Sequence, residues 1–123
     1  MASWTVLFHA AFLPEFDELQ PAVQDELLVK VSMLRVLGPA LKRPHADTLK
    51  GSKHKNMKEL RFEAADGAWR AAFAFDPVRW AIVLVAGDKS GGSSDQFYRQ
   101  LIAKADARFD EHLRVMRQKK DEK

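Results

Sequence analysis

The chain has 123 residues, of which 46% are hydrophobic, and 20 lysines and arginines stand against 17 aspartates and glutamates. This length and apolar content are typical of one folded domain and exclude wholesale disorder. The absence of cysteine excludes disulfide-stapled scaffolds, thiolate zinc sites, iron–sulfur clusters and cysteine nucleophiles, and favours a reducing compartment. The apolar start is interrupted by His9, Pro14 and Glu15, so we expect a cytoplasmic protein that does not enter a membrane.

Positive charge is concentrated in one part of the chain. Residues 1–41 carry a net charge of −3, residues 42–61 carry +5, residues 62–92 carry −1 and residues 93–123 carry +2. A basic block on an otherwise balanced chain is typical of a face that binds a polyanion such as nucleic acid. The alternative is an ordinary solvated loop, because runs of charge are often only solvated.

The first half of the chain predicts one strand and two helices. Residues 4–8 are apolar and rich in aromatic and β-branched side chains, which favours a strand. A proline suits the first turn of a short helix over residues 14–20, and Pro21 opens a second helix with apolar residues at three- and four-residue spacing. Gly38-Pro39 ends that helix. The two helices predict a hairpin, followed by a basic loop over residues 40–55.

The second half predicts strands and a final helix. Three extended runs follow one another at residues 57–64, 68–75 and 80–86. Asp-Gly and Asp-Pro turns separate them, which predicts an antiparallel meander. Ser93 caps an amphipathic helix that is expected to fade into a polar tail at residues 116–123. We therefore expect residues 1–123 to form a single α+β domain with the order β-α-α-β-β-β-α, in which the meander would pack against the helical hairpin and the last helix.

Three kinds of site are excluded by residue spacing and sequence pattern. The four histidines, His9, His45, His54 and His112, show no pairing at helical metal-ligand spacing, so we expect no metal site. Residues 87–92 read Gly-Asp-Lys-Ser-Gly-Gly. A Walker A loop has a glycine, four further residues and then Gly-Lys-Ser/Thr, whereas here Lys89 comes before the glycine pair. A P-loop is therefore rejected. The serines at residues 90–94 lack a nucleophile-elbow pattern, and capping or turn formation explains them.

Basic residues on the predicted sheet remain. The set consists of Lys58, Arg61, Arg70 and Lys89, with His54 and Lys55 on the loop that enters the first run. These groups could converge at one end of a curved sheet. Arginine clamps phosphate, whereas lysine and histidine exchange protons, and a lysine crowded by like charge has a lowered pKa suited to a general base. Together they suit a metal-free phosphodiesterase.

Each basic residue also has a simpler interpretation. Lys58 and Arg61 can be exposed strand residues paired with Glu59 or Glu63, because exposed strand positions are often charged. Tyr98, the only tyrosine, can stack on a nucleobase or lie at the edge of the core.

The pattern resembles a known family. The resemblance rests on the segments Leu49-Lys-Gly-Ser52, Lys58-Glu-Leu-Arg61-Phe62, Trp69-Arg70, Phe73-Ala-Phe75 and Gly87-Asp-Lys89, followed by Phe97-Tyr98 and a helix centred on Ala105. In order and spacing, over roughly residues 4–116, they resemble the RelE/ParE toxin superfamily and within it the HigB-like, phage Gp49-like branch. The resemblance implies a toxin of a type II toxin–antitoxin pair that cleaves mRNA on the ribosome without a metal or other cofactor.

The resemblance also implies roles for individual residues. A ribose 2′-hydroxyl would attack the neighbouring phosphate, with Arg70 and Arg61 on that phosphate, Lys58 or His54 as the base, and Lys89 stabilising charge or protonating the leaving group. An alignment shifted by one residue would place Glu59 at the base position instead. The RNA itself would be held by Lys50, Lys53, Lys55 and Tyr98.

Two other functions use the same basic residues. One is a ParE-like, non-enzymatic inhibitor of DNA gyrase, and the other is nucleic-acid binding alone, within an autoregulatory complex on operator DNA. The clustering of arginine and lysine favours the nuclease, which requires Arg70 and Lys89 to face the same side of the molecule. A toxin further implies a neutralising antitoxin, which we expect to be a helix-turn-helix protein. The toxin would bind operator DNA only as part of its complex with that antitoxin.

Overall fold

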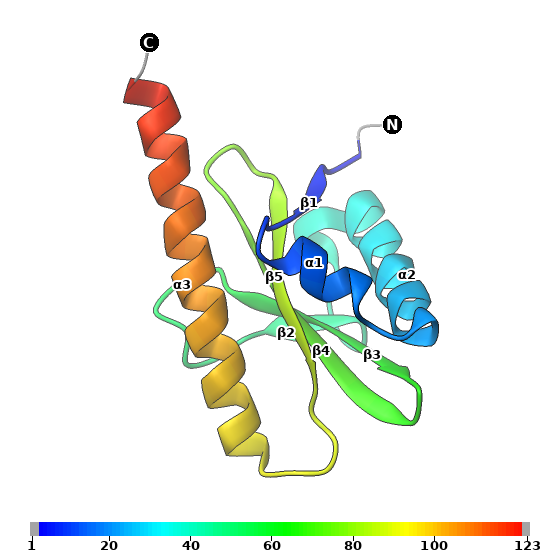
Figure 1. Ribbon diagram of the computed structural model, residues 1–123. Coiled ribbons are helices and arrows are strands. Elements are labelled where there is room, and N and C mark those ends of the chain that lie inside the picture. Colours follow the sequence, from blue (N-terminus) through cyan, green and yellow to red (C-terminus); the bar gives the residue numbers. More distant parts are fainter. Residues whose placement is uncertain (1–2, 122–123) are drawn as a thin grey trace.

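The computed structural model describes residues 3–121, which form one mixed sheet and three α-helices (Figure 1). The elements run in the order β1 (Val6–Phe8), α1 (Phe12–Asp17), α2 (Pro21–Leu37), a short 3-10 turn (Gly38–Ala40), β2 (Ala46–Thr48), β3 (Lys58–Ala64), β4 (Gly67–Phe75), β5 (Ala81–Asp88) and α3 (Ser94–Asp121). Within the described residues, none of the helices combines the length and apolar character that crossing a bilayer requires.

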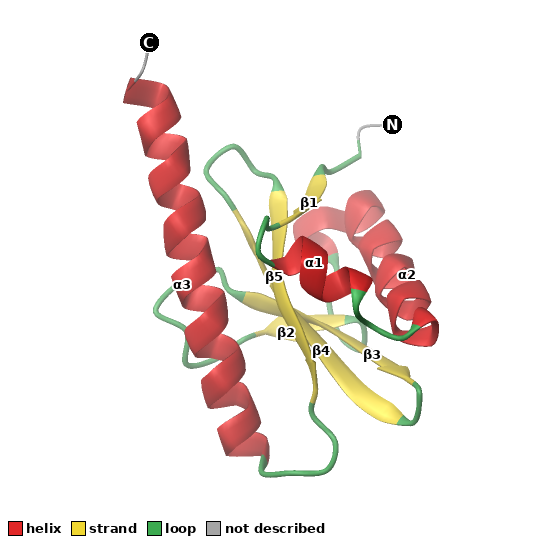
Figure 2. Cartoon of the chain, in the orientation of Figure 1, coloured by secondary structure: helices red, strands yellow, loops and turns green. Residues whose placement is uncertain are grey.

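The sheet of the described chain has five strands in the order β1-β5-β4-β3-β2. Strands β3, β4 and β5 form the predicted antiparallel meander, and β1 adds to β5 in parallel at one edge. Helices α1 and α2 cover one face, whereas α3 crosses the other (Figure 2). The prediction of an α+β fold with a helical hairpin and a C-terminal helix around the meander is confirmed.

The prediction of a loop over residues 40–55 is wrong at one point, because residues 46–48 form strand β2. This strand pairs with β3 at the sheet edge, with Ala46 opposite Leu60 and Thr48 opposite Lys58. Three residues carry too little local pattern to predict a strand, so the pairing arises from the neighbouring strand.

The helix boundaries follow the sequence signals with two exceptions. Helix α2 spans Pro21–Leu37 as predicted, and Gly38 ends it at a φ of +54°, with the Trp4 ring so close that a Cβ on Gly38 would lie 2.3 Å from it. Helix α1 occupies residues 12–17 rather than 14–20. Helix α3 does not fade at residue 116 but continues to residue 121, because Arg, Gln and Lys are good helix formers; the rest of the predicted tail lies outside the described residues.

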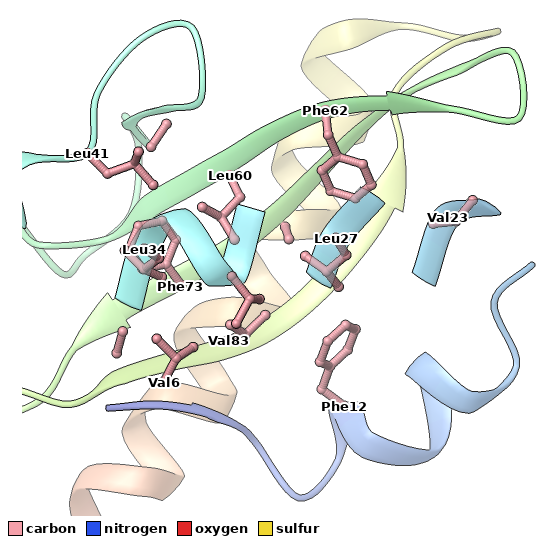
Figure 3. Packing of buried hydrophobic residues seen from close by; sticks show 14 residues of the cluster. Val6, Phe12, Val23, Leu27, Leu34, Leu41, Leu60, Phe62, Phe73 and Val83 are labelled. Atoms are coloured by element: carbon pink, nitrogen blue, oxygen red, sulfur yellow. The ribbon is translucent and has the colours of Figure 1, made fainter. Parts of the chain in front are cut away.

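The core lies on both faces of the sheet. On the hairpin face, Leu60, Phe62 and Val83 point toward Phe12 and Leu27 (Figure 3). On the other face, apolar residues of α3 pack on β4 and β5, with Leu101, Ala105 and Phe109 spaced four residues apart as on one helix side. Strand β5 contributes to both clusters, which explains its uninterrupted apolar sequence.

An ion pair joins the two helical layers across the sheet. The guanidinium of Arg108 on α3 donates two hydrogen bonds to the Glu15 carboxylate on α1, at 2.8 and 2.6 Å, and a third to the carbonyl of Leu84 at 2.7 Å. These hydrogen bonds hold the pKa of Glu15 below its ordinary value. Arg108 therefore ties both helices to strand β5.

We expect Arg108→Ala to lower the free energy of unfolding by about 1–2 kcal/mol at neutral pH, because it removes charged hydrogen bonds of which one partner is partly exposed. A carboxyl with a lowered folded-state pKa stabilises the fold above its unfolded pKa and loses this contribution as the pH falls through the folded value. The deficit should therefore shrink near pH 3. Urea unfolding at neutral pH and near pH 3 measures this loss of unfolding free energy, with Arg114→Ala, at an exposed arginine, as the control. An equal loss at the two pH values would contradict the role of the Glu15 carboxylate.

Candidate functional site

Four side chains from β3, β4 and α3 meet on the face of the sheet that α3 crosses. Arg61 and Arg70 are direct partners in the β3–β4 register, so their side chains leave the sheet on the same face. Glu59 lies two residues before Arg61 on that face, and Tyr98 comes from the start of α3. We call these four residues the ionic cluster.

Glu59 holds the two arginines of the ionic cluster. Its Oε2 accepts a hydrogen bond from Arg61 Nη1 at 2.9 Å, and its Oε1 lies 3.9 Å from Arg70 Nε. Both Glu59 and Arg70 are buried, at 3% and 7% exposure, whereas the Arg61 side chain is 24% exposed. Two guanidinium groups side by side repel each other, so the carboxylate between them makes the arrangement tolerable. Among the described residues, Glu59 Oε1 has no hydrogen-bond partner.

Tyr98 connects this cluster to Lys89. The Tyr98 hydroxyl accepts a hydrogen bond from Arg70 Nε at 3.3 Å, and Lys89 Nζ lies over the Tyr98 ring, 6.0 Å from its centre. Burial raises the pKa of Tyr98; the hydrogen bond with Arg70 opposes this rise, and the Glu59 carboxylate adds to it. Tyr98 is thus a neutral phenol between a buried guanidinium and a partly exposed ammonium, and Arg70 and Lys89 face the same side of the molecule.

Lys89 comes from the loop between β5 and α3. Its backbone N–H donates to the carbonyl of Ala68 at 2.7 Å, which anchors the start of the loop to β4. The carboxylate of Asp88 accepts hydrogen bonds from the backbone and hydroxyl of Ser90. A groove of about 210 Å³ runs along this loop and reaches Phe97 and Gln100 on α3. Lys89 is the basic residue that lines this groove, whereas the residues of the ionic cluster do not line it.

Lys58 does not join the ionic cluster. It pairs with Phe73 in the β3–β4 register, and Phe73 packs in the core beneath α2, so Lys58 lies on the opposite face from Arg61. The expected convergence of Lys58 with Arg61 and Arg70 is wrong, because successive side chains of a strand point to opposite faces.

His54 and the nearby lysines also lie away from the cluster. His54 Nε2 contacts Asp110 Oδ1 at 2.8 Å, and Lys53 forms an ion pair with the same carboxylate. Asp110 follows Tyr98 by twelve residues on α3, which corresponds to about 18 Å along the helix axis. Lys50 and Lys55 are exposed on this loop. The loop is therefore a second basic surface, separate from the ionic cluster.

The sequence analysis named Glu59 only as an ion-pair partner of Lys58 or Arg61 and, in a shifted alignment, as the base; the structure pairs it with Arg61. A signal for it existed, because Glu59 and Arg61 alternate to the same face of a strand and Arg70 occupies the matching position on the next one. Among the described residues, no group of three or more His, Cys, Asp or Glu side chains is arranged to hold a metal ion.

Comparison with known proteins identifies the class first. The fold matches that of a solved structure of the E. coli toxin RelE, a mutant in the free state, with a TM-score of 0.60 and 14% identity over 83% of this chain and 96% of that one. At this identity the match shows a RelE-like fold.

Sequence similarity then identifies the family. Residues 14–110 match the family described as phage-derived protein Gp49-like, and the chain belongs to that family. It is 49% identical over 84 residues to a Mycobacterium tuberculosis protein named toxin HigB2, covering 68% of this chain and 41% of that protein. It is 42% identical over 83 residues to another, named toxin HigB3, covering 68% and 70%. The predicted HigB-like branch is confirmed.

Proposed function

We propose that this chain is the toxin of a type II toxin–antitoxin pair and that it cleaves messenger RNA on the ribosome. The observation that carries the proposal is the ionic cluster together with Lys89, which lies beside it. Arg61 and Arg70 of the cluster face the same side of the molecule as Lys89. Guanidinium groups in such an array bind a phosphodiester through paired hydrogen bonds. The names of the M. tuberculosis relatives and the RelE-like fold support the same proposal.

In the proposed reaction, the 2′-hydroxyl of one nucleotide attacks the adjacent phosphorus. The bond from phosphorus to the 5′-oxygen breaks, leaving a 2′,3′-cyclic phosphate and a free 5′-hydroxyl. Arg70 and Arg61 bind the phosphate and stabilise the charge that develops on its oxygens. Lys89 gives a proton to the departing 5′-oxygen, and Tyr98 supports a nucleobase or holds Arg70 in place.

We assign the base to Glu59 rather than to Lys58 or His54. Glu59 is the carboxylate next to both arginines, and its Oε1 is free to accept a proton. Arg61 is the more exposed of the two arginines, so a bound phosphate can draw its guanidinium outward and open Glu59 to the 2′-hydroxyl. Lys58 points to the other face of the sheet.

The basic loop has a separate role in this proposal. Lys50 and Lys55 are exposed and would bind the phosphate backbone of the message or of the ribosome. Lys53 and His54 are held by Asp110 and orient the loop. An antitoxin of the helix-turn-helix class would neutralise the toxin in the cytoplasm and carry it to operator DNA.

The proposal is tested by adding the purified protein to a cell-free translation reaction and mapping new message ends by primer extension. We expect new ends that depend on ribosomes, and 3′ fragments whose 5′-hydroxyl accepts phosphate from polynucleotide kinase without prior phosphatase treatment. Parallel reactions contain the message without ribosomes, and supercoiled DNA with gyrase.

Each arm has a distinct outcome. Cleavage without ribosomes would retain the nuclease and overturn its ribosome dependence. No new ends, together with inhibition of gyrase, would replace the nuclease with the ParE-like function. Fragments with a 5′-phosphate would overturn attack by the 2′-hydroxyl, because that route leaves the phosphate on the other fragment.

A further inference from the structure

The outer side of α2 carries a line of exposed residues. Helix α2 lies on the side of the sheet away from α3 (Figure 1), and its buried residues face the sheet. On its outer side, exposed residues recur at three- and four-residue spacing, which places them in one line along the helix. We call this line the α2 stripe. It consists of Asp25, Leu28, Val29, Ser32, Arg35 and Val36.

The α2 stripe presents apolar surface around a small residue. Leu28, Val29 and Val36 are 44%, 50% and 68% exposed, and they are three of the nine large apolar side chains that are exposed in the described chain. The Ser32 hydroxyl donates a hydrogen bond to the carbonyl of Leu28 at 3.0 Å, so it needs no partner outside the helix. A second helix can therefore approach closely over Ser32 and remove the apolar side chains from water.

The charges of the α2 stripe differ between its two ends. Asp25 stands near the start of the helix, with exposed Glu26 beside it, and exposed Arg35 lies in the last turn. Within residues 3–121, neither Asp25 nor Arg35 forms an ion pair. Lys30 is turned away from the stripe, toward His45 Nδ1 at 2.9 Å. A helix that binds antiparallel to the stripe must therefore carry an acid at its own start and a base at its own end.

The α2 stripe of a second copy has this order of charges. When two copies of α2 run antiparallel about a two-fold axis beside residue 30, each residue lies opposite the one equally far from residue 30 on the other side. Asp25 stands five residues before this point and Arg35 five residues after it, so opposite charges face each other at both ends. Leu28 and Ser32 face each other in the same way, which places a large side chain against a small one.

We propose that the α2 stripe binds a second copy of this chain, with the two helices antiparallel. Leu28, Val29 and Val36 of each copy supply the apolar contact. Asp25 of each copy pairs with Arg35 of the other, which fixes the direction and register of the two helices. One pair of short helices buries less surface than a permanent dimer does, so the association is reversible and depends on concentration.

The dimer leaves the ionic cluster open. The cluster lies on the face of the sheet that α3 crosses, whereas α2 covers the other face. The two cationic sites of a dimer therefore point away from the interface. The proposal stands apart from RNA cleavage, because it rests on the exposed side of α2 alone.

The first test is sedimentation equilibrium of the full chain over a range of concentrations. We expect a dimer whose share rises with concentration and falls with added salt, because screening weakens the ion pairs at its ends. Val29→Glu should weaken the association about tenfold or more, since it places two carboxylates close to the two-fold axis. A thermal melt near that of the unmodified chain shows that the variant is folded.

Charge reversal distinguishes a second copy from any other occupant. Asp25→Arg alone and Arg35→Asp alone should each weaken the association about tenfold, because each places like charges opposite one another at both ends. An equimolar mixture of these two variants should dimerise as the unmodified chain does, since opposite charges face each other again. The matched controls are Arg114→Asp and Glu63→Arg, which reverse exposed charges outside α2 and should dimerise normally.

Other results would overturn the dimer. They are a chain that stays monomeric at every concentration, a dimer that Val29→Glu leaves intact, or charge-reversal variants that do not recover when mixed. If the chain stays monomeric, and the purified product of the neighbouring reading frame binds it but not Val29→Glu, the α2 stripe belongs to that protein instead. Because association is measured without RNA, a failed nuclease assay leaves the result interpretable.

Discussion

Replacing Arg70 with alanine should lower the rate of RNA cleavage by about 100-fold, the usual effect of removing one fixed donor to the charge of a transition state. Arg70 is buried, and both the Tyr98 hydroxyl and Glu59 lie beside its Nε. Its guanidinium is therefore held in place before the phosphate binds. The rate is measured in cell-free translation from the appearance of primer-extension ends.

Two further variants help to interpret the Arg70→Ala result. Arg70→Lys keeps the charge but loses the paired hydrogen bonds, so we expect it to recover only part of the rate while melting near the temperature of the unmodified chain. Arg35→Ala, at an exposed arginine of α2, is the matched control and should cleave normally. Full activity of folded Arg70→Ala would contradict a role for Arg70 in holding the phosphate.

Glu59→Gln should also lower cleavage by about 100-fold, which is within the range lost when a general base is removed. The substitution keeps the shape of the side chain and removes the negative charge and the free Oε1 lone pairs. If Glu59 is the base, the reaction needs a carboxylate at this position, so Glu59→Asp should recover more of the rate than Glu59→Gln does. Equal rates in the two folded variants would contradict the assignment of Glu59 as the base.

Lys58→Ala separates the two assignments of the base. Lys58 lies on the face beneath α2, so we expect its removal to leave the rate of cleavage unchanged. Normal cleavage by Glu59→Gln, together with a loss in Lys58→Ala, would overturn the assignment of Glu59. Thermal melts of both variants control for stability, because Glu59 lies between two arginines.

Residue patterns predicted only some of the residues that meet in the site. Composition and order along the chain pointed to Arg61, Arg70, Lys89 and Tyr98, which the structure brings together. The same reasoning grouped Lys58 with them, although the alternation of a strand separates Lys58 from Arg61. Which face of β3 would be covered by α3 depends on how the helices pack, and that was not visible in the pattern.

Distance along α3 explains the other departure. His54 and Lys53 stand only a few residues before Lys58 in the sequence, but Asp110 holds both of them far along α3 from Tyr98. Nearness in sequence therefore did not predict nearness in space. The ion pair forms because the loop before β3 crosses α3 well beyond its first turns.

By itself, the sequence determined the elements that depend on neighbouring residues: the bounds of α2, the meander of β3, β4 and β5, and the arginines those strands carry. Periodicity, prolines and glycines act over a few residues, so the chain alone contains that information. Only the tertiary structure decided that β2 forms, that α3 covers the face of β3 that carries Glu59 and Arg61, and that α3 extends past the sheet. These features depend on strand register and on helix packing between residues far apart in the chain, which no local pattern specifies.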